Sequence, residues 1–81
     1  MNKKIYPLTN CNILKKLLEE ELHISVSYAI DIDNDIITFR LYDRTQNINY
    51  CYKIEAFYLL SDILLPTVYN KIVALYYEMR K

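Results

Sequence analysis

An acidic string, Asp31-Ile32-Asp33-Asn34-Asp35, contains the residue types of this 81-residue chain best suited to binding a metal ion. Carboxylates at alternate positions open the common calcium-binding loop, because Ca²⁺ takes several oxygen ligands. The sixth position of that loop is a glycine and the twelfth a bidentate glutamate, whereas this chain has Ile36 and Tyr42 there. The alternation of apolar and polar residues on both sides also predicts that this segment is a turn between two strands. We therefore expect an acidic turn and no metal site.

Nucleophilic or histidine-based chemistry has few candidate residues. His23 is the only histidine, so a site with several histidine ligands is excluded. Cys11, Cys51, Ser25 and Ser27 are candidate nucleophiles. The two serines alternate along a predicted strand beside His23, as on an exposed polar face, and His23 falls where a helix ends.

Glycine is absent from the whole chain. Phosphate-binding P-loops, dinucleotide-binding turns and nucleophile elbows all require glycine, so these sites are excluded. No pair of carboxylates has an evident acid–base arrangement. We expect a protein that is not an enzyme and that uses no cofactor.

Charge is segregated along the chain although the net charge is zero. Residues 1–18 carry four lysines and no acid, residues 19–35 carry six acids and no lysine or arginine, and residues 36–81 are weakly basic. The block from Glu19 to Asp35 is a candidate acidic patch for a basic partner. Solvated helix-end and turn residues are the alternative.

Two cysteines without CxxC spacing indicate reduced thiols in an intracellular protein. Residues 1–12 have lysines but no apolar run of a signal peptide, and no segment approaches the ~18 apolar residues of a membrane span. We expect a cytoplasmic protein. The abundance of Asn, Ile, Lys and Tyr suggests an AT-rich genome, such as that of a low-GC bacterium or its phages.

Three strands are predicted in the middle of the chain. Apolar and polar residues alternate over residues 24–33, 36–43 and 48–55. Asp33 and Asn34 tolerate positive φ and suit the first turn, and residues 43–47 form a second polar turn. The result is an antiparallel meander with one apolar face.

Helical periodicity flanks these strands. It predicts a helix over residues 10–22, a short helix from Ala56 to about Leu65, and a last helix over residues 66–80; a single helix kinked at Pro66 is the alternative. The chain is then one α+β domain, residues 1–81, of order α-β-β-β-α-α. The helices cover the apolar face of a three-stranded sheet in two layers.

The nine tyrosines fall into two groups. One group lies on predicted core stripes, with hydroxyls expected at the periphery: Tyr28, Tyr50, Tyr52 and Tyr76. Tyr42, Tyr58 and Tyr77 lie off those stripes. Tyr42 shares the outer sheet face with Arg40, and tyrosine with arginine is typical of interfaces.

The element order carries one resemblance. A helix at Leu14–Leu22, alternating runs over Ile24–Ile54 and helices over Ala56–Met79 are similar to a kind of small phage-encoded anti-CRISPR protein. The resemblance covers most of the chain and rests on element order, not on a motif. It implies an inhibitor that occludes the nucleic-acid groove of a CRISPR nuclease with an acidic surface, for which only residues 19–35 qualify here.

We therefore expect a non-catalytic protein-binding module, an antagonist encoded by a phage or another mobile element. Its partner is a protein, such as a basic nucleic-acid-binding one, and not a membrane. The expected contact residues are Asp31, Asp33, Asp35, Arg40 and Tyr42. The alternatives are a nucleic-acid-binding regulator that dimerises through its C-terminal helix, and a purely structural homo-oligomer. The double-stranded-RNA-binding domain has a similar order, but its last helix starts with a lysine cluster, whereas residues 55–60 of this chain contain no lysine.

Overall fold

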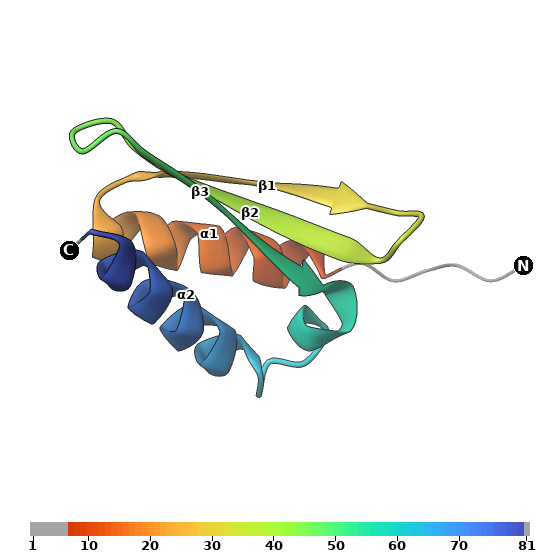
Figure 1. The fold of residues 1–81 in the computed structure, drawn as a ribbon. Helices are drawn as coiled ribbons and strands as arrows, with labels where there is room; N and C mark the ends of the chain where they lie inside the picture. The colour runs from red at the N-terminus through yellow and green to blue at the C-terminus, as the bar shows by residue number, and fades with distance from the viewer. Residues whose placement is uncertain (1–6, 81) are drawn as a thin grey trace, which may run out of the picture.

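A computed structural model describes residues 7–80 and shows a two-layer α+β fold (Figure 1). The elements are helix α1 (Leu8–Leu22), strands β1 (Ser25–Asp31), β2 (Ile36–Asp43) and β3 (Ile48–Glu55), the 3₁₀ helix η1 (Ala56–Leu59) and helix α2 (Leu65–Met79). The predicted order is confirmed. The lysine-bearing start of the chain, residues 1–6, lies outside the described residues.

Helix α1 places one apolar stripe against the sheet. Cys11, Leu14 and Leu18 are fully buried, at the helical spacing that the sequence indicates. The helix ends at His23, which adopts the left-handed conformation (φ 54°) and donates its backbone N–H to the carbonyl of Glu19 at 2.9 Å. This closes the last turn in the manner usually provided by glycine.

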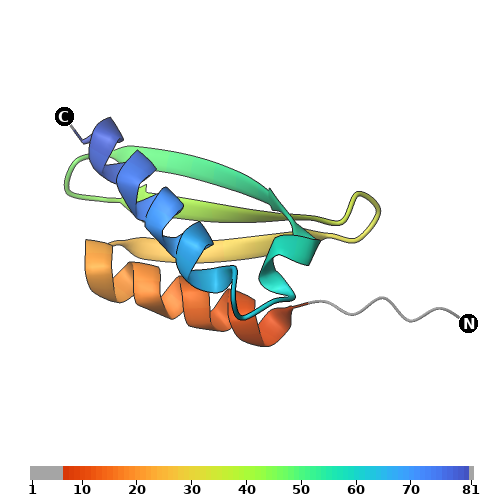
Figure 2. The same ribbon diagram turned by 90° about the horizontal axis from the view of Figure 1, so that it is seen from below.

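The sheet has the order β1-β2-β3, with both neighbouring pairs antiparallel. The alternation predicted from the sequence is confirmed: Ile37, Phe39 and Leu41 on the central strand are fully buried on one face. The other face presents Thr38, Arg40 and neighbouring polar residues. Both helices lie on the apolar side, with α1 along β1 and α2 crossing the sheet obliquely (Figures 1 and 2).

The two hairpin turns share one construction. The side chain of Asp31 accepts hydrogen bonds from the backbone N–H groups of residues 33 and 34, and the side chain of Asp43 accepts them from those of residues 45 and 46. The fourth turn residue is left-handed in each, Asp35 (φ 54°) and Asn47 (φ 55°). The expectation of positive φ at Asp33 and Asn34 is therefore wrong, because the left-handed residue of each four-residue turn is its last one. Strand β1 also ends earlier than predicted, and Ile32 in the turn is exposed.

The short helix predicted over residues 56–65 is only the 3₁₀ helix η1, followed by turns up to α2. The Nδ2 of buried Asn10 donates to the carbonyl of Leu59 at 2.6 Å and to Asp62 at 3.1 Å. The Leu59 carbonyl therefore bonds a side chain, while the N–H of Ile63 donates to the hydroxyl of Ser61 at 3.2 Å. Because the Leu59 carbonyl and the Ile63 N–H both bond side chains, the helical hydrogen bond between them is not made and the helix ends here. A single helix kinked at Pro66 is excluded as well, since α2 begins at Leu65.

Helix α2 buries Val68, Ile72 and Tyr76 in the common core. This stripe is used inside the fold, so it is not available for the dimerisation expected of a nucleic-acid-binding regulator. The helical period would place Met79 on the same stripe, but it is exposed at the end of the helix.

The hydroxyl of Tyr76 lies inside the protein rather than at the periphery, contrary to the prediction. It donates to Oδ2 of the buried Asp43 at 2.6 Å and thereby ties the end of α2 to the second hairpin. This hydrogen bond lowers the pKa of Asp43. Burial, followed by the same hydrogen bond, raises the pKa of Tyr76 to about 12.

The substitution Tyr76→Phe should lower the free energy of unfolding by about 1–3 kcal/mol, because a buried hydrogen bond to a charged acceptor is lost. The folded pKa of Asp43 lies below its usual 3.8, so the stabilisation is present above that value and is lost as the pH falls through the lowered pKa. The difference between wild type and variant should therefore shrink on acidification. Urea denaturation at neutral and acidic pH measures it, with Tyr77→Phe, on an exposed neighbour, as the control. A difference that does not change with pH would contradict the role given to Asp43.

Candidate binding site at the hairpin end of the sheet

The five residues expected to contact a partner lie along the sheet rather than at one point. Asp31 ends β1, and Asp33 and Asp35 lie in the turn that follows. Arg40 and Tyr42 are exposed on the outer face of β2, where Tyr42 pairs with Ser25 at the far end of β1. Six residues of strand separate Tyr42 from Ile36, which is about 20 Å. A standard interface is about 30 Å across, so one partner could span them, but the structure gathers only the three aspartates.

Asp31 is mainly a structural residue of the first turn. Its Oδ1 accepts the N–H groups of Asp33 (3.1 Å) and Asn34 (3.2 Å), and its Oδ2 accepts the side-chain amide of Asn34 at 2.8 Å. The side-chain bond from Asn34 is the main reason that the pKa of Asp31 is lowered. Asp31 therefore stays ionised while it shapes the turn.

The turn is held in place from the other side by Asp35. The carbonyl of Asp35 accepts the backbone N–H of Ala56 at 2.8 Å, which joins the turn to the start of η1. Asp33 lies between these two anchors and is exposed. A positioned turn with exposed aspartates presents negative charge without a further ordering cost.

The acidic block from Glu19 to Asp35 does not form one patch, contrary to the prediction. Strand β1 separates its two parts, so Glu19–Glu21 lie at the end of α1 and the aspartates at the opposite end of the molecule (Figure 1). Glu19 also has structural partners, the Nζ of Lys15 at 3.1 Å and the backbone N–H of Val26 at 3.4 Å. Only the aspartates of the turn remain as a compact acidic feature.

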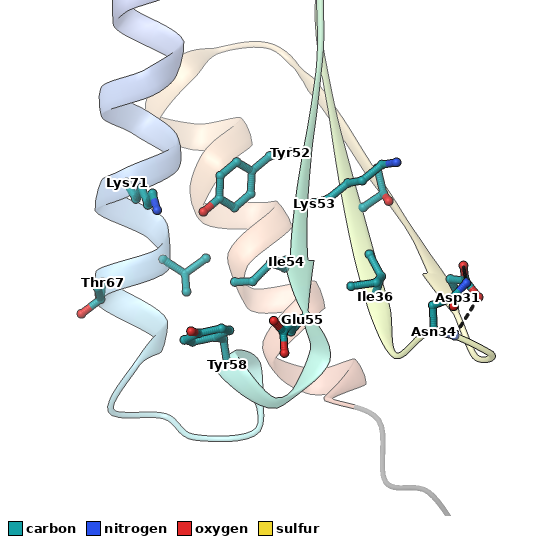
Figure 3. Close-up of a pocket in the computed structure, with 12 residues that line it drawn as sticks. Asp31, Asn34, Ile36, Tyr52, Lys53, Ile54, Glu55, Tyr58, Thr67 and Lys71 are labelled. Atoms are coloured by element: carbon teal, nitrogen blue, oxygen red, sulfur yellow. Dashed lines mark hydrogen bonds between the residues drawn. The ribbon is translucent and has the colours of Figure 1, made fainter.

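A hollow of about 630 Å³ adjoins this turn and continues along β3 (Figure 3). Asp31 and Asn34 lie at one side of it, and Thr67 and Lys71 of α2 lie at the other. Between them, the walls are largely apolar or aromatic side chains: Ile36, Tyr52, Ile54, Tyr58 and Val68. Concave, mostly apolar surface with a few polar groups is the usual form of a binding site.

Exposed apolar side chains lie on η1 and in the turns that follow it. We call Phe57, Tyr58, Leu60 and Ile63 the apolar segment; their exposed fractions are 52%, 41%, 49% and 84%. The rings of Phe57 and Tyr58 stack with centroids 4.1 Å apart. A group of large exposed apolar residues marks an interaction surface more often than chance exposure does.

The three tyrosines predicted off the core stripes are all exposed, as expected, and Tyr58 lines the hollow. Lys71, which lines the hollow from α2, was not predicted as a site residue. Its spacing from Thr67, four residues on a flank of the buried stripe, is the signal that could have indicated it. Ile63 lies in the segment predicted to form a short apolar helix and is instead the most exposed large apolar residue of those described.

Within residues 7–80, no three His, Cys, Asp or Glu residues are placed to hold a metal ion. Cys11 is buried, which raises the pKa of its thiol to about 11, and Cys51 is exposed on the outer sheet face. Neither helix of the described part is long and apolar enough to span a membrane.

The hairpin end is thus defined by the aspartate turn, the hollow and the apolar segment. No protein-family model, curated protein or solved structure matches this chain.

Proposed function

We propose that the protein is a non-catalytic binding module that contacts a partner protein through its hairpin end. The observation that carries the proposal is the placement, at one end of the molecule, of an acidic turn beside the apolar segment. Apolar and aromatic anchors surrounded by charged residues are the composition of a protein–protein contact. The carboxylates at its rim favour a basic partner.

A host nucleic-acid-binding protein of the cytoplasm fits this chemistry, because its groove carries the positive charge that the turn would meet. The protein would then act as an antagonist encoded by a phage or another mobile element, as anti-CRISPR proteins of similar element order do on a CRISPR nuclease. This class is supported by the small size of the protein and by the exposed aspartates of the first turn. The zero net charge limits the attraction to this end of the molecule.

Affinity capture from a low-GC bacterial lysate, read by mass spectrometry, tests the proposal. Wild type should retain a nucleic-acid-binding protein, and Phe57→Ser/Ile63→Ser should lose it, because these exposed side chains would be buried only in the complex. Leu17→Ser/Tyr77→Ser removes two exposed apolar side chains that lie outside the apolar segment and should retain the partner. Equal retention by both variants would remove the apolar segment from the function.

A further inference from the structure

The two edge strands of the sheet differ in whether another element contacts their free edge. Strand β1 lies beside α1, whose Glu19 accepts the outward backbone N–H of Val26 at 3.4 Å and whose Asn12 accepts the hydroxyl of Tyr28 at 2.7 Å. Strand β3 forms the opposite edge. Unprotected edge strands are templates for pairing with another chain.

The backbone groups that β3 presents at this edge follow from the ladder. In antiparallel pairs, successive residues direct their N–H groups alternately toward and away from the neighbouring strand. The N–H of Val26 points away from β2, so that of its partner Leu41 points toward β3, where Leu41 pairs with Tyr50. Four residues of β3 therefore direct their backbone N–H and C=O groups away from β2: Asn49, Cys51, Lys53 and Glu55. Within residues 7–80, no side chain or other element bonds their N–H groups.

The hollow lies along the second half of this edge and has walls on both sides of it. Figure 3 shows Tyr52 and Ile54 directed toward α2, and Lys53 on the other side of the strand with Ile36. Strand β3 is also regular over its eight residues, without proline and with continuous pairing to β2. An added strand would find both hydrogen-bonding groups and space at this position.

We propose that a second copy of this chain occupies the edge, with β3 pairing antiparallel to β3 of the partner about a two-fold axis at Ile54. In this register Lys53 lies opposite the Glu55 of the other copy, and the reverse holds across the axis, so both ion pairs form. The N–H and C=O groups of Lys53 and Glu55 make the new ladder. A two-fold interface repeats each contact, so the ion pair between Lys53 and Glu55 occurs twice.

Charge and space select this register over its neighbours. An axis at Lys53 would place two lysines opposite each other. An axis at Tyr52 or at Cys51 would leave Lys53 and Glu55 opposite uncharged residues, and an axis at Cys51 would also centre the pairing on a residue that does not line the hollow. The dimer goes beyond the proposed partner contact: its ladder is made by Lys53 and Glu55, which line the hollow, whereas that contact uses the aspartate turn and the apolar segment.

Sedimentation equilibrium across a range of protein concentrations tests the dimer. Wild type should dimerise, and Lys53→Glu should weaken the association by about tenfold or more, because carboxylates then oppose each other on both sides of the axis. Adding Glu55→Lys to that variant restores opposite charges and should restore the dimer. Arg40→Glu makes the same charge change on the central strand and should leave the association unchanged.

Amide hydrogen exchange supplies the register. The N–H groups of Lys53 and Glu55 should become protected on association, while those of Asn49 and Cys51 stay unprotected. A wild-type protein that remains monomeric at its highest soluble concentration overturns the proposal, and the edge is then free for a strand of another protein. A dimer that Lys53→Glu does not weaken, or that leaves Lys53 and Glu55 unprotected, overturns it equally.

Discussion

The substitution Phe39→Ala should leave the protein largely unfolded at room temperature. Phe39 is fully buried at the centre of β2, and its ring lies 5.7 Å from that of Tyr28. Truncating a buried phenylalanine costs about 3–5 kcal/mol, because the transfer free energy is lost and a cavity remains. A single small core of this size supplies only about 3–5 kcal/mol of net stability. Circular dichroism during urea denaturation measures the loss.

The adjacent residue provides a matched control for this prediction. Thr38 is on the same strand and faces the opposite side of the sheet, so Thr38→Ala should change the free energy of unfolding by about 0.5 kcal/mol or less. Similar losses for both variants would show that β2 does not bury alternate side chains, and the division into an apolar and an outer face would be wrong.

The second large effect is expected from the aspartate turn. Asp33→Lys/Asp35→Asn should slow association with a basic partner by about tenfold or more at low salt. Asparagine is chosen at residue 35 because it keeps the left-handed conformation that this position requires. The difference from wild type should shrink as salt is added, since exposed charges are screened beyond about 10 Å at 0.1 M. Stopped-flow association kinetics with the captured partner measures it.

The control for this prediction uses the other part of the acidic block. Glu20→Lys/Glu21→Gln changes the net charge by the same amount at the opposite end of the molecule (Figure 1). Its association rate should remain near that of wild type. If both variants slow association equally, net charge rather than the position of the turn controls binding.

The parts of the fold that depend on local periodicity could be predicted from the sequence. The alternation around Phe39 indicated the strands and their buried face, and the spacing of Leu14 and Leu18 indicated α1. These patterns are local because each strand or helix buries one face of its own residues. The same reasoning placed the exposed tyrosines correctly, including Tyr58 beside the hollow.

The features that could not be predicted depend on contacts between distant residues. Asn10 and Leu59 are 49 residues apart in sequence, and their hydrogen bond ends the helix that periodicity favoured. Asp43 and Tyr76 are 33 residues apart, so nothing local indicated that this aspartate is buried. The hollow is likewise lined by side chains from β1, β2, β3 and α2.

The candidate site was predicted only in part for the same reason. Asp31, Asp33 and Asp35 are adjacent in sequence, and the structure keeps them together. Whether they lie near Glu19 or near the apolar segment depends on the direction of β1. That strand carries the turn away from the end of α1, and the Asp35–Ala56 hydrogen bond joins it to η1.

The central claim, that the hairpin end is the contact surface, is tested most directly by amide hydrogen exchange of the protein with and without its captured partner. If the hairpin end is the contact surface, complex formation slows amide exchange in residues 31–35 and 57–63 and leaves exchange on the exposed side of α1 unchanged. Protection confined to the helices, with the turn and the apolar segment exchanging as in the free protein, would contradict it.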